Sequence, residues 1–181
     1  MKKQMRLLGM AAGLFVGLGI SGGAEEANLL LNGDLEELAP RINLPRDWTF
    51  ARETTSIASN AFSGKSAVRI SQYYTCQITD IPDVAGKKYR LSGHFMNETT
   101  DTKVVASLGI MYVDSQDKTH AIQSPAAVSA SPDWVEINYT TAALPPDAVR
   151  IIRFMIYVSG KNAKGEKAAI VMDNLKLLEA K

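Results

Sequence analysis

Alternating apolar and polar positions dominate the sequence between residues 68 and 177. The alternation is clearest where Tyr89, Leu91 and Phe95 are separated by polar residues. A period of two over a short run indicates a half-buried β-strand. Further runs of this kind lie at 68–70, 74–78, 104–113, 134–139, 149–158 and 168–177. We find no stretch with the period and length of an amphipathic helix, so the pattern predicts a chain built of strands.

Turn-forming residues separate these runs at fairly even spacing. Glycine, proline, asparagine and aspartate gather between them, as in Pro82–Gly86, Ser131–Asp133 and Pro145–Asp147. Many short strands separated by such turns are typical of an antiparallel sandwich or barrel. The segment Leu38–Asp47, with two prolines and two arginines, is predicted to be a long surface loop.

The first 24 residues have the pattern of a signal peptide. Three basic residues precede an apolar run over 7–20, and Gly22 and Ala24 fit a signal-peptidase site. We therefore predict cleavage after Ala24, a secreted or periplasmic protein, and one mature domain over 25–181. A membrane anchor is the alternative, but a run of about 14 residues is short of the roughly 20 that span a bilayer. We expect no membrane insertion after cleavage.

The charge of the chain is balanced. There are 20 basic and 19 acidic residues; without the three basic residues of the leader, 17 basic residues face 19 acidic ones. The charges are also dispersed along the sequence. A surface of this kind has no electrostatic attraction toward nucleic acid or anionic membranes, so neither is expected as a partner.

The sequence offers no recognisable catalytic motif. Gly64-Lys65-Ser66 resembles the end of a phosphate-binding loop, but Ser59 stands where that motif needs glycine. The single cysteine, Cys76, lies in an alternating run and is predicted to be a small buried apolar residue. We predict that the protein is not an enzyme. A carboxylate pair for glycoside hydrolysis is defined by the distance between the two groups in the folded protein, which the sequence does not give. An unrecognised glycoside-active enzyme is therefore the minor alternative.

Acidic residues at the two ends of the mature chain suggest a metal site. Asp34 and Glu36 are two positions apart and share a face if this segment is extended. Asp173 lies inside an apolar strand, where a carboxylate is costly unless it is hydrogen-bonded, paired or bound to a metal. Calcium prefers carboxylate and carbonyl oxygens. If the chain ends meet, these residues could share a calcium ion; the alternative is that Asp173 accepts backbone hydrogen bonds.

An ordered set of short motifs resembles carbohydrate-binding modules of the family 4, 9 and 22 type. These modules share the galactose-binding-domain-like jelly roll. The match covers residues 28–178, and its segments are, in order, Asn28–Glu36, Trp48, Ala61–Ile70, Gly86–Phe95, Trp134 with Pro145-Pro146, and Asp173–Leu177.

The resemblance implies an all-β antiparallel sandwich, a jelly roll of about nine strands, whose concave face often carries a glycan-binding cleft. It implies a structural calcium ion with side-chain oxygens from Glu36 and Asp173, and with Lys65 and Asp34 contributing carbonyl or carboxylate oxygen. It also implies that Trp134 belongs to the core, with the first and last strands joined by the acidic residues.

Sugar rings stack on exposed aromatic faces, and neighbouring polar side chains fix their orientation. Strand parity places Arg90 with His94, and Arg153 with Tyr157, on common faces. The candidate ligand-binding residues are Trp48, Tyr73, Tyr74, Arg90, His94, Tyr112, Arg153 and Tyr157.

We therefore predict a secreted, monomeric, non-catalytic module that binds a polysaccharide or glycoconjugate. An adhesion, envelope or matrix protein that uses the same fold without binding sugar is the alternative.

Overall fold

The computed structural model describes residues 26–71, 73–98, 104–129, 132–160 and 169–181. The predicted signal peptide lies outside these residues. A single 3-10 turn, η1 (Arg52–Thr54), precedes the strands of the described part. The strands are β1 (Thr55–Ala58), β2 (Ala67–Ser71), β3 (Tyr73–Pro82), β4 (Lys88–Asn97), β5 (Val104–Asp114), β6 (Thr119–Gln123), β7 (Ala127–Ser129), β8 (Val135–Thr140), β9 (Ala148–Ser159) and β10 (Ala169–Ala180).

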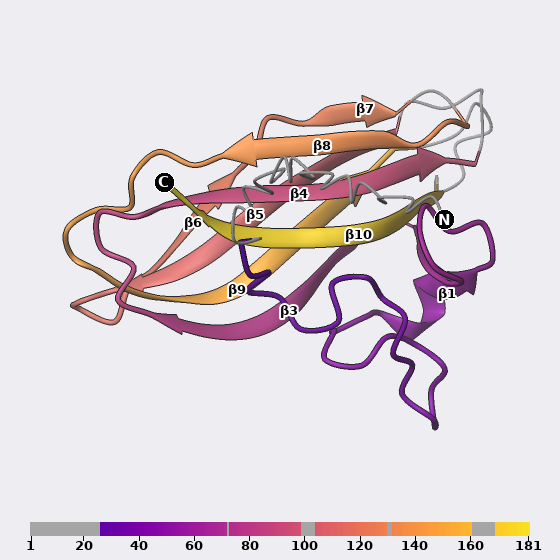
Figure 1. The fold of residues 1–181 in the computed structure, drawn as a ribbon, viewed down its shortest axis with the longest axis horizontal. Helices are drawn as coiled ribbons and strands as arrows, with labels where there is room; N and C mark the ends of the chain where they lie inside the picture. The colour runs from indigo at the N-terminus through magenta and orange to yellow at the C-terminus, as the bar shows by residue number, and fades with distance from the viewer. Residues whose placement is uncertain (1–25, 72, 99–103, 130–131, 161–168) are drawn as a thin grey trace, which may run out of the picture.

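The strands form two antiparallel sheets that pack face to face (Figure 1). One sheet has the order β1-β2-β10-β4-β8. The other has the order β3-β9-β5-β6, and β7 also pairs with β5. The predicted all-β jelly-roll sandwich is confirmed.

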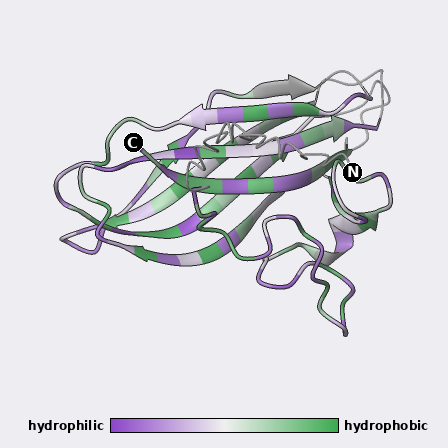
Figure 2. Cartoon of the chain, in the orientation of Figure 1, coloured by the Kyte–Doolittle hydropathy of each residue, from purple (hydrophilic) through white to green (hydrophobic). Residues whose placement is uncertain are grey.

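The core lies between the two sheets and is filled from both. Tyr89, Leu91 and Phe95 of β4 face Phe154 and Ile156 of β9, and all five side chains are buried in one cluster. Figure 2 shows hydrophobic and hydrophilic residues alternating along the strands, as the sequence pattern predicts. Cys76 is also buried, and burial raises the pKa of its thiol. Its predicted role as a small buried residue is confirmed.

Three short strands were not predicted from the alternation. β6 reads Thr-His-Ala-Ile-Gln, and four of its five residues are exposed. It lies at the edge of its sheet, so no apolar face marks it in the sequence. β1 and β7 have only four and three residues, which is too short for a periodic signal.

The segment that precedes η1 is not a strand, which corrects the expectation of an opening strand over Asn28–Glu36. Leu29 donates one backbone hydrogen bond to the Leu177 carbonyl of β10. The Asn28 side chain then takes the place of further backbone hydrogen bonds. Its NH2 group donates to the Leu175 carbonyl, and its side-chain oxygen accepts from the Leu177 amide. A turn follows at once, so the segment docks on β10 without forming a ladder.

We expect Phe154→Ala to lower the free energy of unfolding by about 3–5 kcal/mol, because it leaves a cavity in the middle of the core. The Phe154 ring is fully buried and packs edge-on against Trp48 at 6.1 Å between centroids. Urea denaturation measures the change. Val149→Ala on the same strand is the control, because Val149 is exposed; its effect should stay within about 0.5 kcal/mol. Equal losses for both variants would contradict this location of the core.

Candidate functional site

The outer face of the β3-β9-β5-β6 sheet brings together several of the predicted ligand-binding residues. On β9, Phe154, Ile156 and Val158 point into the core. The alternate residues Arg153, Met155 and Tyr157 therefore point outward. The strand register places three rows of side chains across this face: Tyr74–Tyr157–Ser107, Cys76–Met155–Gly109–Gln123 and Ile78–Arg153–Met111–Ala121.

Two tyrosines form an aromatic pair in the first row. The rings of Tyr74 and Tyr157 lie 6.1 Å apart between centroids and are tilted by 38°. Tyr74 is 53% exposed, whereas Tyr157 is half-buried. The Tyr157 hydroxyl donates to the Met155 sulfur at 3.2 Å, so its ring leans over the middle row. Burial raises the pKa of Tyr157.

The middle row forms an apolar floor beneath the tyrosines. Met155 and Cys76 are almost fully buried although they lie on the outer face of the sheet. Gly109 lies between Met155 and Gln123, and the Gln123 amide donates to the Ser107 hydroxyl. A polar pair thus borders an apolar floor on the β5–β6 side.

One basic side chain, that of Arg153, also lies in these three rows. Arg153 is half-buried and lies directly between Ile78 and Met111 in the register. Its positive charge lowers the pKa of Tyr157 and of Cys76, against the larger effect of burial on each. The guanidinium is therefore within electrostatic reach of the tyrosine pair.

A hollow of about 230 Å³ opens beside Tyr74. It is lined by Thr49, Phe50, Ala51 and Tyr74. Thr49 pairs with Cys76 at the free edge of β3, so this segment forms a rim next to the tyrosine pair. The rim and the exposed Tyr74 ring give the face one shallow recess.

The structure corrects the prediction that Trp48 and Tyr112 bind the ligand. Their side chains are only 8% and 7% exposed and belong to the core. Trp48 follows a turn and donates its indole N–H to the Asn32 carbonyl, which fixes the ring inward. Tyr112 has the core-facing parity of β5. Tyr73 starts β3, and its side chain lies outside the described residues.

Arg90 and His94 lie on the opposite surface of the molecule from Arg153. They belong to the outer face of β4, in the other sheet. Arg90 pairs with Glu26 at 3.0 Å. His94 is covered by Phe62, with ring centroids 3.5 Å apart, and burial lowers its pKa. The predicted ligand-binding residues therefore divide between two surfaces, because strand parity does not say to which sheet a strand belongs.

The expectation that Trp134 belongs to the core is also corrected. It is only partly buried and packs on the outside of the sheet, against a small cluster of Ala67, Met96 and Val171. Its ring contacts Phe62 edge-on at 5.9 Å between centroids. It does not belong to the main core.

The two chain ends meet at Asp173, as predicted. Asp173 is fully buried on β10, and its carboxylate accepts the amides of Ser63 at 2.9 Å and Asn174 at 2.6 Å. Glu36 accepts the amides of Lys65 at 2.6 Å and Ser66 at 2.9 Å through one oxygen. Burial raises the pKa of Asp173, and the nearby charge of Glu36 raises it further. Two carboxylates thus hold one loop against the sheet.

Gly64 allows this loop to approach Glu36. A side-chain carbon at Gly64 would lie 2.2 Å from the Glu36 carboxylate oxygen, and the backbone has φ +68°. Only glycine fits both conditions. Gly64-Lys65-Ser66 is therefore a turn that binds a carboxylate of the same chain, not a phosphate loop.

Asp34 is not part of this cluster. It is exposed in the turn at residues 31–34, and Leu35, with φ 61°, is buried instead. The segment is therefore not extended, and Asp34 does not share a face with Glu36. Across the described ranges, no three His, Cys, Asp or Glu side chains gather as metal ligands.

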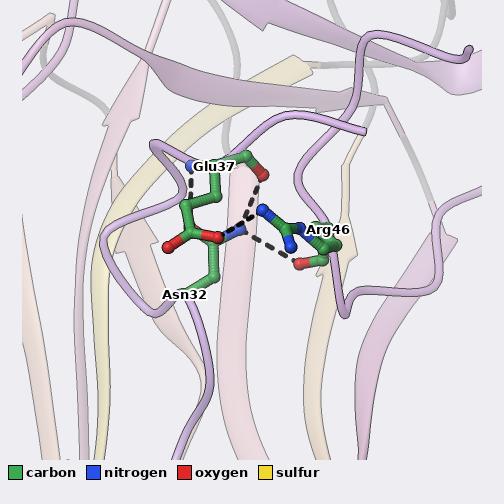
Figure 3. Close-up of polar contacts among 3 residues, drawn as sticks. All are labelled: Asn32, Glu37 and Arg46. Carbon is green, nitrogen blue, oxygen red and sulfur yellow. Dashed lines mark hydrogen bonds and ion pairs between the residues drawn. The ribbon is translucent and has the colours of Figure 1, made fainter. Parts of the chain in front are cut away.

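Asn32 organises the predicted surface loop (Figure 3). Its amide donates to the carbonyls of Glu37 and Arg46, and its carbonyl accepts from the Glu37 amide. Glu37 and Arg46 also form an ion pair at 2.6 Å. The loop closes with a bridge between Leu38 and Pro45. The asparagine of the Asn-Gly-Asp motif is thus a structural residue.

Comparison with known proteins identifies the fold. No family model matches the sequence, and no curated protein matches it. The solved structure of the CBM22-1 xylan-binding domain from Paenibacillus barcinonensis Xyn10C is similar, with a TM-score of 0.58 and 16% identity over 86% of this chain and 96% of that domain. A family 16 carbohydrate-binding module has a TM-score of 0.57 and 18% identity over 84% of this chain and all of its own. The chain has the fold of carbohydrate-binding modules.

A further module with this fold is known with its ligand bound. The structure of TmCBM61 in complex with β-1,4-galactotriose has a TM-score of 0.53 and 17% identity over 85% of this chain and 99% of that module. At these identities the similarity establishes the fold of the module, and its ligand must be argued from the side chains. In the part that the structure describes, no helix is both long and apolar enough to cross a bilayer.

The β5–β6 hairpin, at one side of the β3-β9-β5-β6 sheet, is held by contacts of Asp114. Its carboxylate contacts the His120 ring at 2.8 Å and accepts the amides of Gln116 and Lys118. These contacts, led by that to His120, lower the pKa of Asp114 from 3.8 to about 2. The stabilisation is therefore present above about pH 4 and is lost as the pH falls toward 2.

We expect Asp114→Asn to lower the melting temperature at pH 7 and to flatten its fall between pH 4 and 2, since the depressed pKa is removed. Thermal melts across this range test the prediction. Asp117→Asn in the same turn is the matched control, because it makes the same change of residue and asparagine tolerates the φ of 59° at this position. A fall as steep in Asp114→Asn as in the unmodified protein would contradict the prediction.

Proposed function

We propose that this protein is a non-catalytic module that binds a polysaccharide or other glycan on the outer face of the β3-β9-β5-β6 sheet. The observation that carries the proposal is the pair of Tyr74 and Tyr157 with Arg153 on one exposed face. Aromatic faces stack on the C–H groups of sugar rings, while the phenols, Arg153 and Gln123 can hydrogen-bond to hydroxyl groups. A mixed apolar and polar surface of this kind fits a sugar better than a purely apolar ligand.

The fold supports the same function. Similar structures include a xylan-binding domain and a module that holds β-1,4-galactotriose, so a β-linked polysaccharide is a reasonable first class of ligand. Acid–base hydrolysis of a glycoside needs two carboxyl groups flanking the bond. In the three described rows of this face, every outward side chain is neutral or basic, which favours binding over hydrolysis. We further propose that the leader over residues 1–24 exports the module to where such polymers occur.

We expect Tyr74→Ala and Tyr157→Ala each to weaken glycan binding by about tenfold, because loss of one stacking ring costs roughly 1–1.5 kcal/mol. A glycan array with the purified protein first identifies the ligand, and isothermal titration then measures the affinities.

Two control variants separate stacking from general damage to the fold. Tyr157→Phe keeps the ring and should retain most of the affinity. Phe62→Ala removes an exposed aromatic residue from a loop that packs on the opposite sheet, and it should leave binding unchanged. The proposed function would be rejected if no glycan on the array bound, or if Phe62→Ala abolished binding while both tyrosine variants retained it.

We also propose a structural calcium ion at the junction of the chain ends. The two acidic groups support this proposal, because the buried carboxylate of Asp173 lies near enough to Glu36 to be affected by its charge, and both carboxylates accept backbone amides of the same loop. The ion would supply the positive charge that this pair lacks. Glu36 and Asp173 would hold it through side-chain oxygens, with amide contacts to the loop adjusting around them.

We expect saturating calcium to raise the melting temperature by roughly 5–10 °C at a hundredfold excess over Kd, and a chelator to reverse the rise. Asp173→Asn should abolish the shift, because it removes the buried charge. Asp34→Asn should retain it, because Asp34 lies outside the cluster. An unchanged melting temperature in saturating calcium would reject the ion and leave the glycan proposal intact.

A further inference from the structure

The position of Arg153 bears on which sugars this face would bind. Arg153 lies on β9, which is paired on both sides by β3 and β5. Its cross-strand neighbours are Ile78 on one side and Met111 on the other, and both are apolar. A cation in the middle of a sheet face, between apolar side chains, has no neutralising group in its own row.

Four other arginines whose side chains the structure describes are paired with carboxylates. Arg46 pairs with Glu37, Arg69 with Glu98, Arg90 with Glu26 and Arg150 with Asp80. Among the described residues, Arg153 has no such ion pair, and neither has Arg41 on its loop. The carboxylate nearest along β3 from Ile78 is Asp80, which is largely exposed and already contacts Arg150 at 3.6 Å. Arg153 is thus a half-buried residue that has no carboxylate partner within the described part of the chain.

The guanidinium is also within electrostatic reach of Tyr157. Its charge acts on the Cys76 thiol, one row away on the same face, and on the Tyr157 phenol, two rows away. From Tyr157 to Arg153 the strand covers four residues, or roughly 13 Å. That span is longer than one sugar ring, so a chain of several sugars stacked on Tyr157 would extend toward Arg153.

We propose that the glycan bound on this face is acidic, and that Arg153 binds the carboxylate or sulfate group of one of its sugars. This inference rests on the proposed function and names the ligand class of the same site. Arginine presents a planar fork of donors that matches carboxylate and sulfate oxygens in a bidentate manner. The acidic group of the glycan pairs with Arg153, while Tyr74 and Tyr157 stack on the adjoining sugar rings.

The test compares polymers that differ only in charge. Polygalacturonate is compared with the same polymer after reduction of its carboxyl groups, and dextran sulfate with dextran. Titrations are run at physiological ionic strength, where long-range attraction between exposed charges is screened. The first pair tests a carboxylate ligand and the second a sulfate ligand.

We expect at least one acidic polymer to bind about tenfold more tightly than its neutral counterpart, a factor within the usual strength of a charge-assisted bidentate contact. Arg153→Gln should remove this preference, so that the acidic polymer binds no more tightly than its neutral counterpart. Arg153→Lys should retain part of it, since the charge remains and the fork is lost. Arg90→Gln makes the same change of charge on the opposite sheet and should leave the preference unchanged.

Two results would overturn the inference: equal binding of acidic and neutral polymers, or a preference that survives Arg153→Gln. The glycan array separates this failure from that of the proposed function. Binding of neutral glycans alone rejects the acidic ligand and keeps the proposed function. An array without any bound glycan rejects both.

Discussion

The fold depends on the buried carboxylate of Asp173 and the strand that carries it. β10 lies between β2 and β4, so the end of the chain forms the centre of a sheet. Buried carboxylates are tolerated only when their oxygens are satisfied. The Ser63 and Asn174 amides do this for Asp173, and in doing so they attach the 62–66 loop to β10. The carboxylate that is costly to bury thus attaches a loop to the central strand of the sheet.

A bulge in β10 makes this arrangement possible. The register against β4 shifts between Asp173 and Lys176, and Asn174 adopts φ 50°. Such a bulge re-aims the side chain next to it. Asp173 turns toward the outer loop while Met172 and Leu175 stay in the core. The Leu175 amide then donates to the Gly33 carbonyl, which ties the N-terminal segment to the same point. The two ends of the domain therefore meet at one irregularity in the last strand.

Much of the fold could be predicted from the sequence because burial imposes a period of two on long strands. β4, β5, β9 and β10 have one face in the core, and each was predicted. The edge strand β6 carries no such pattern, since almost all of its residues are exposed. The contact of the chain ends was predictable from Glu36 and Asp173, whose charges are out of place in an apolar context. The turn that removes Asp34 from this cluster depends on backbone angles at Asn32 and Leu35, which the residue types do not reveal.

The candidate site was predictable only in part, because a side chain's parity specifies its face but not its sheet. Parity correctly grouped Arg153 with Tyr157, and Arg90 with His94. Pairing of β3 with β9 was needed to bring Tyr74 beside Tyr157, and pairing of β4 with β10 was needed to separate Arg90 from both. The two outer faces then differ in their chemistry. On β4, the arginine has Glu26 and the histidine lies beneath Phe62. On β9, Arg153 has no carboxylate partner among the described residues and Tyr157 is half-buried, while Met155 between them is almost fully buried. This difference is the reason for placing the proposed glycan site on the β9 face.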